Sequence, residues 1–265
     1  MKRIIELDFT RGIAVNLMIL AHIGMFTIIT LKNLNLASVY ESIKSKTTIK
    51  IFDLIGVFAH TLFLVLVGIN MVTSYKKNEN LSLKESRSKY IKKNVKRGLF
   101  VGILGLIMSF LTFIIFGDWF IIFGIFQFIA ISIFLTIPIQ LYYNEFIVII
   151  GVIFCLVIHK FIQFPTQNNI NIFSIITGKV NKNTKYIDFF PILPYFGLIL
   201  LGLIIGNIIH KDDSIYSKFN KKQSENKLVK EISFMGKWSI QIYFLHIILI
   251  FCTMKLVLGK SKINI

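Results

Sequence analysis

The sequence has little of what builds a soluble or a disulfide-stapled domain. Of its 265 residues only 16% are charged, and the two cysteines, Cys155 and Cys252, both stand inside apolar runs. They offer no disulfide framework and no metal-ligand spacing, and in such surroundings a thiol behaves as a small buried hydrophobe. Disordered, collagen-like and coiled-coil chains are excluded by composition. The sequence therefore predicts no metal cofactor.

Long apolar runs take the place of these missing features. Hydrophobic residues make up 55% of the chain, and roughly 20 of them are enough for one membrane-crossing helix. We predict an all-α, multi-pass bundle of about seven transmembrane helices that forms one domain over residues 1–265. The predicted spans are Ile13–Leu31, Ile55–Tyr75, Leu99–Phe116, Trp119–Leu141, Phe146–Phe164, Ile192–Ile209 and Ser239–Leu258.

Acidic residues are scarce, with 13 against 30 lysines and arginines, which leaves a net charge of +17. In a soluble protein this excess would suggest nucleic acid, but in a membrane protein it indicates which side each connector faces. The connectors 76–97 and 211–237 hold nine and seven basic residues and are predicted to be cytoplasmic. Alternation then places the amino terminus in the cytoplasm and the carboxyl terminus outside. We predict a cell-membrane protein whose partner is the lipid bilayer and not nucleic acid.

The first span carries ionisable residues on one face. Arg11 and His22 are eleven residues apart, so on a helix they lie within roughly 20° of each other and about 16 Å apart. This spacing places Arg11 at the cytoplasmic mouth and His22 near the middle of the bilayer. Asp8 stands three residues before Arg11 and can pair with it. Ionisable groups in hydrocarbon cost several kcal/mol and usually face a cavity or a partner.

Other spans repeat this pattern with different residues. His60 follows Asp53 by seven residues on one face of the second span, and His246 follows Ser239 by seven in the last. Any single histidine here could be a hydrogen-bonding partner in helix packing. Taken as a set, these groups predict the acceptor side of a site: Asp53, His60, Asn70, Gln127, Asp188, Tyr243 and His246. Asp188 could also cap or pair with a helix end.

Small residues at a spacing of four predict close helix packing rather than chemistry. The two instances are Gly105-x-x-x-Ser109 and Gly202-x-x-x-Gly206. In the second span, Gly68 allows another backbone to approach closely. These residues are therefore expected to hold the bundle together.

Several motifs resemble those of a known family. Residues 7–14, Leu-Asp-Phe-Thr-Arg-Gly-Ile-Ala, followed by His22, are similar to the D-x-x-R-G-I-A…H opening of the transmembrane acyltransferase superfamily. Three further segments resemble the catalytic domain of heparan-α-glucosaminide N-acetyltransferase and its prokaryotic relatives: Phe63–Gly68, Asp188–Gly206 and Gly236–His246. Gln127 stands where these relatives commonly have a histidine.

The resemblance implies an acyltransferase with acetyl-CoA as co-substrate and a saccharide acceptor on the far side of the membrane. It assigns donor handling and catalysis to Arg11 and His22, with Asp8 and Gly12 beside them. Independently of the resemblance, a histidine suits proton acceptance near neutral pH, and an arginine suits a phosphate of an anionic donor. His22 would act as general base or as a transient acetyl carrier.

Other functions remain open on the sequence. A transporter or permease would use the same polar faces as a substrate path, although no inverted repeat is visible. A retinal photoreceptor needs a lysine in the middle of the last span, whereas Lys255 lies near its outer end. The substitution at Gln127 leaves a catalytically inactive relative as a third alternative. The oligomeric state is also open, a homo-oligomer included.

Overall fold

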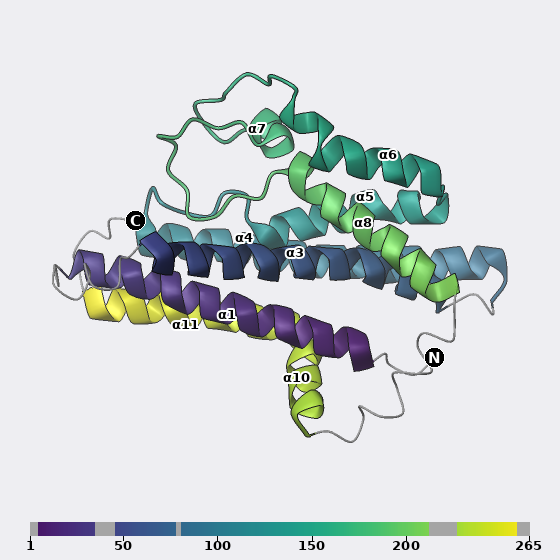
Figure 1. Cartoon of the computed structure of the whole chain (residues 1–265), viewed down its shortest axis with the longest axis horizontal. Coiled ribbons are helices and arrows are strands. Elements are labelled where there is room, and N and C mark those ends of the chain that lie inside the picture. The colour runs from purple at the N-terminus through teal and green to yellow at the C-terminus, as the bar shows by residue number, and fades with distance from the viewer. Residues whose placement is uncertain (1–4, 35–45, 78–80, 212–226, 259–265) are drawn as a thin grey trace. The chain divides into compact units, whose positions relative to one another are not determined.

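The computed structural model describes residues 5–34, 46–77, 81–211 and 227–258 (Figure 1). Over these ranges the regular structure is helical, with two isolated bridges, Phe123 to Phe189 and Gln167 to Val180. The all-α prediction is therefore confirmed. The helices are α1 (Ile5–Asn33), α3 (Lys46–Lys76), α4 (Leu83–Phe116), α5 (Ile125–Leu141), α6 (Glu145–Leu156), η1 (Ile158–Lys160), α7 (Ile172–Thr177), α8 (Ile192–Lys211), α10 (Lys227–Lys237) and α11 (Ser239–Leu258).

The chain divides into two compact units, and the boundary falls within α3, after Phe63. The central unit comprises the described residues from Leu64 to Lys211. The terminal unit comprises the described residues up to Phe63 together with those from Lys227 onward. Each unit is described by itself below.

Within the described residues, five helices are long and apolar enough to cross a membrane: α1, α3, α4, α8 and α11. A multi-pass membrane protein is thereby confirmed. The other two predicted spans are also helical but shorter, because α5 has 17 residues and α6 has 12. The fourth apolar run begins as a turn before Ile125, and the fifth passes from α6 into the single turn of η1. Both helices fall short of the roughly 20 residues of a full span.

Helix α4 extends well beyond the predicted span into the basic connector. Ser82 caps its first turn, with Oγ accepting a hydrogen bond from the Glu85 N–H at 3.4 Å. Lysine, arginine and glutamate are good helix formers, and in the extension Ser86, Tyr90 and Asn94 are buried on one face. The basic residues of this segment therefore lie on a helix rather than in a loop.

The central unit relies on glycines where α3 meets α8. A Cβ added to Gly202 would collide with the Val65 carbonyl oxygen, and one added to Gly68 would lie 2.8 Å from the Gly202 Cα. At the next turn, a Cβ on Gly206 would lie 2.9 Å from the Val72 side chain. The prediction that these glycines serve helix packing is confirmed.

Replacing Gly202 with alanine is expected to destabilise the central unit by about 1–3 kcal/mol, since the added methyl overpacks a backbone contact. Gly102→Ala is the matched control, because its Cβ would meet Ala130 at an ordinary 3.5 Å. In a helix that control should be neutral or gain up to about 1 kcal/mol. Thermal unfolding in detergent measures the stability of both variants. Equal unfolding midpoints for the two would contradict the close contact of α3 and α8 at Gly202.

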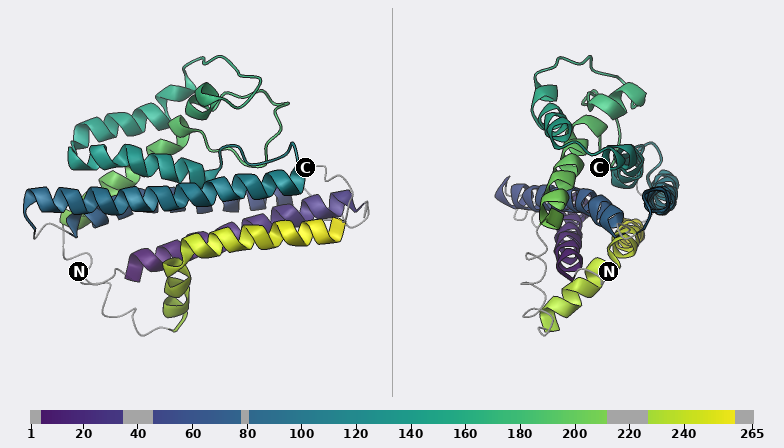
Figure 2. Two further views of the ribbon diagram at one scale, coloured as in Figure 1. Left: turned by 180° about the vertical axis from the view of Figure 1, so that it is seen from behind. Right: turned by 90° about the vertical axis from the view of Figure 1, so that its right-hand side faces the viewer.

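In the terminal unit α1 and α11 lie side by side and run in the same direction (Figures 1 and 2). Their contacts progress in step along both helices: His22 meets His246, and further on Phe26 meets Phe251 with ring centroids 5.2 Å apart. Helix α10 precedes α11 and packs across the first half of α1. The amino end of α1 and the start of α11 thus lie at the same end of this unit.

Candidate active site

Two glycines let α10 approach α1 closely. A Cβ added to Gly12 would collide with the backbone of Ile232, and one added to Gly236 would collide with the Asp8 carbonyl oxygen. Beside them, Asn16 Nδ2 donates to Met235 Sδ at 3.3 Å. The structural part played by Gly12 is therefore to admit α10, while its predicted contact with a donor remains a prediction.

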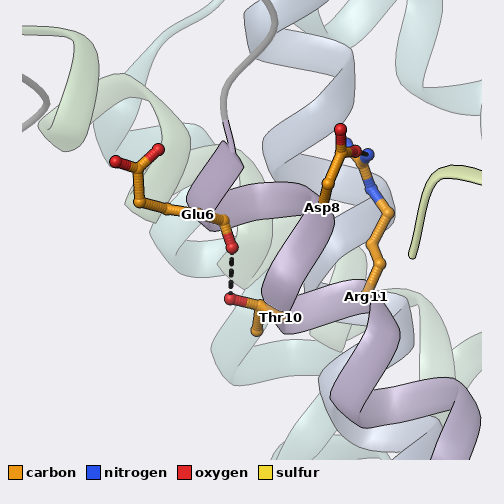
Figure 3. A network of polar contacts seen from close by, with 4 residues as sticks. All are labelled: Glu6, Asp8, Thr10 and Arg11. Atoms are coloured by element: carbon orange, nitrogen blue, oxygen red, sulfur yellow. Dashed lines mark hydrogen bonds and ion pairs between the residues drawn. The ribbon is translucent and has the colours of Figure 1, made fainter. Parts of the chain in front are cut away.

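The predicted ion pair forms at this end of α1 (Figure 3). Arg11 Nη1 donates to Asp8 Oδ1 across one helical turn, and Thr10 Oγ1 donates to the Glu6 carbonyl oxygen at 2.7 Å. The Asp8 side chain is 7% exposed and that of Arg11 is 20% exposed. A carboxylate so enclosed needs its cation, so the pair fixes the guanidinium of Arg11 at the base of the polar face.

The histidines of the first and last spans meet further along α1. His22 Nδ1 lies 3.0 Å from His246 Nε2, and His246 Nδ1 lies 3.1 Å from the Ile242 carbonyl oxygen. The Tyr243 ring flanks both, with centroids 6.0 Å from that of His22 and 5.1 Å from that of His246. The parallel packing of α1 and α11 thus gathers three predicted site residues into one cluster, which we call the histidine cluster: His22, Tyr243 and His246.

An apolar groove continues from the histidine cluster between α1 and α11. Its empty volume, open mouth included, is about 630 Å³. The three threonines in its wall donate to carbonyl oxygens of their own helices, Thr27 to Ile23 and Thr30 to Phe26 at 2.7 Å, and Thr253 to Ile250 at 2.8 Å. The hydroxyl protons of these threonines are therefore used within their own helices. Its lining is Ile23, Phe26, Thr27, Thr30, Leu31, Ile250, Thr253, Met254 and Val257.

The first half of α3 also belongs to the terminal unit and carries two more predicted site residues, Asp53 and His60. Gly56 of α3 faces Ala21, which precedes His22, and a Cβ on Gly56 would lie 3.6 Å from that of Ala21. His60, one turn later, bonds to the Gly56 backbone, and Asp53 is exposed. Their acceptor role remains a prediction, as does that of Asn70, which lies half-buried on the other half of α3.

Gln127 joins α4 to α5 in the central unit. Its Nε2 donates to the Gly105 carbonyl oxygen at 2.8 Å and to Ser109 Oγ at 2.7 Å, and its Oε1 accepts from the Gly124 N–H at 3.1 Å. Gly105 and Ser109 thus serve helix packing as predicted. These bonds give Gln127 a structural part in the fold, and its predicted contact with an acceptor is untested.

Asp188 caps the start of α5, which confirms the expectation that it serves a helix end. Its Oδ2 accepts from the Ile125 N–H at 3.3 Å. Burial raises the pKa of the Asp188 carboxyl to about 6, against the opposing effect of the backbone N–H groups of Ile125 and Phe189. Its contact with an acceptor remains a prediction.

The raised pKa of Asp188 predicts a pH-dependent stability. The carboxyl releases its proton near pH 4 in the unfolded chain and near pH 6 in the folded one, so the folded state loses stability as pH rises through this window. We expect Asp188→Asn to remove this loss, at most about 3 kcal/mol, while keeping the acceptor for Ile125. Thermal unfolding at pH 4.5 and 7.5 tests this, and a constant offset between variant and wild type would refute it.

Three features of this site were not predicted from the sequence. They are the direct contact of His22 with His246, the hydrogen bond between His246 and the Ile242 carbonyl oxygen, and the crossing of helix α10 over α1. Only the last had a signal, because Val229, Ile232 and Gly236 recur at helical spacing among lysines. Within the described ranges no three histidine, cysteine or acidic side chains lie together as a metal site.

Comparison with known proteins gives a family but no near relative. No curated protein and no solved structure matches the chain. The model of one family, described as heparan-alpha-glucosaminide N-acetyltransferase, catalytic, matches residues 3–248. This match covers nearly the whole chain and includes α1, α10 and all three residues of the histidine cluster. The chain therefore belongs to the heparan-alpha-glucosaminide N-acetyltransferase catalytic family.

Proposed function

We propose that the protein moves an acetyl group from cytoplasmic acetyl-CoA to an amino or hydroxyl group of a saccharide on the other side of the membrane. Family membership gives a membrane acyltransferase in general terms. The observation that carries the finer proposal is the single polar face of α1. It joins the Asp8–Arg11 pair at one end to His22, in contact with His246, at the other.

The spacing along this face fits an elongated donor. Eleven residues of helix separate Arg11 from His22 by about 16 Å, a length that an acyl-pantetheine arm can span. Arg11 would bind a phosphate of the donor through its planar guanidinium. Basic residues on α10, which packs against the first half of α1, would raise the local concentration of an anionic donor. No metal is required by this arrangement.

His22 would act on the thioester in one of two ways. As a general base, it takes the proton from the acceptor nitrogen or oxygen that attacks the carbonyl carbon, while the C–S bond breaks and the thiolate of CoA leaves. As an acetyl carrier, its own nitrogen attacks first, CoA leaves, and the acceptor then takes the acetyl group from the imidazole. Both routes need an imidazole nitrogen with a lone pair.

The decisive experiment supplies the donor and the acceptor on opposite sides of a membrane. Protein in vesicles receives labelled acetyl-CoA on one side and an amino sugar on the other. We expect the label to appear on the sugar with one free thiol released for each acetyl group moved. Movement of donor or sugar without thiol release would overturn the proposal in favour of transport. Label that appears on the protein with donor alone, and that brief treatment with acid or hydroxylamine removes, would identify the acetyl-carrier route.

A further inference from the structure

The hydrogen bonds of the histidine cluster determine where its protons lie. The Ile242 carbonyl oxygen can only accept, so the His246 Nδ1 that lies 3.1 Å from it must carry a proton. A neutral imidazole has a single N–H, and a charge on either ring would cost several kcal/mol within the membrane. With its proton on Nδ1, His246 is left with a lone pair on Nε2.

This lone pair decides the state of His22 in turn. His22 Nδ1 lies 3.0 Å from His246 Nε2, and two lone pairs cannot share a hydrogen bond. His22 must therefore donate from Nδ1, which leaves the lone pair on its own Nε2. Two hydrogen bonds therefore follow one another: His22 Nδ1–H donates to His246 Nε2, and His246 Nδ1–H donates to the Ile242 carbonyl oxygen of α11. We call this pair of bonds the relay, and it leaves the lone pair of His22 Nε2 available.

We propose that His246 is a positioning residue that holds His22 in the Nδ1–H tautomer, so that His22 Nε2 is the atom that takes the proton or the acetyl group. This inference rests on the proposed function for the chemistry at His22. It changes the part assigned to His246 from lining the acceptor side to orienting the base. Tyr243, packed against both rings, limits their rotation.

The same contact serves the acetyl-carrier route. Attack by His22 Nε2 on the thioester forms a C–N bond, breaks the C–S bond and leaves a positive charge on the ring. The Nδ1 proton can then move to His246 Nε2, so the acetyl-imidazole is neutral and the positive charge lies on His246, whose Nδ1–H still donates to the Ile242 carbonyl oxygen. An orienting partner of this kind, when lost, costs a catalytic histidine roughly 10²–10⁴-fold in rate.

Two variants of His246 test whether its side chain acts as a hydrogen-bond acceptor for His22 or only fills space. His246→Gln can keep an acceptor near the position of Nε2, whereas His246→Leu fills the space without one. We expect kcat for acetyl transfer to fall about 10²–10³-fold in the leucine variant and to recover at least tenfold in the glutamine variant. The KM for acetyl-CoA should stay within about threefold in both, because donor binding is assigned to Arg11. Equal rates in the two variants would overturn the proposal.

A second measurement reads the tautomer without turnover. In protein labelled with ¹⁵N-histidine, the His22 signals are assigned by their loss in His22→Gln. We expect the wild-type signals of an imidazole protonated on Nδ1, and loss of this preference in His246→Leu. A proton on Nε2 of His22 in the wild type would refute the relay, even if the variants fail to fold. An Nδ1–H imidazole in a protein without acetyl transfer would refute the proposed function and leave the relay standing.

Discussion

Replacement of His22 with alanine is expected to lower acetyl transfer by about 10³-fold or more, because the variant has neither the base nor the acetyl carrier of the proposed reaction. The loss should fall on kcat, while the KM for acetyl-CoA changes little, since Arg11 remains. A residue that acts only in the transition state lowers kcat and kcat/KM together. Steady-state release of free thiol measures both quantities.

His210→Gln is the matched control for this prediction. His210 Nε2 bonds to Thr73 Oγ1 at 3.0 Å within the central unit, so it is a histidine of similar polarity in a packing contact. Its replacement should leave acetyl transfer within about threefold of wild type. If His22→Ala transfers acetyl groups at the wild-type rate, the catalytic assignment fails. If both variants lose activity equally, the loss reports destabilisation and the assignment loses its support.

Helical periodicity was sufficient to predict the polar face of α1. Asp8 and Arg11 are neighbours within one helix, so their ion pair follows from spacing alone. Hydrophobic runs predicted α8 and α11 to within two residues at each end. Local sequence therefore predicts features that depend on a single helix.

Contacts between helices were beyond such reasoning. The sequence placed His22 and His246 in different spans, and nothing in either span sets the rotation of α1 against α11. That rotation depends on where backbones can approach, as Gly12 and Gly236 allow at the crossing with α10. For α10 the sequence predicts only a charged connector, because its lysines outweigh its short apolar face.

Exchanging Arg11 for methionine is expected to have two separate effects. Loss of the guanidinium breaks the ion pair of the enclosed Asp8 carboxylate, which should cost roughly 3 kcal/mol of stability. Loss of the guanidinium should also raise the KM for acetyl-CoA by about tenfold to a hundredfold with a smaller change in kcat, as removal of a binding contact does. A single variant mixes these effects, so its kinetics alone would not identify a donor site.

The double variant Asp8→Asn/Arg11→Met separates stability from donor binding. The double variant removes both charges of the ion pair, so thermal stability in detergent should return to near that of the wild type. The KM for acetyl-CoA should stay high, because the Arg11 guanidinium is still missing. Recovery of both stability and KM would show that Arg11 serves only to neutralise Asp8, and the donor would then have to bind elsewhere. Recovery of stability alone assigns the phosphate contact to Arg11, at the opposite end of the same helix face from His22.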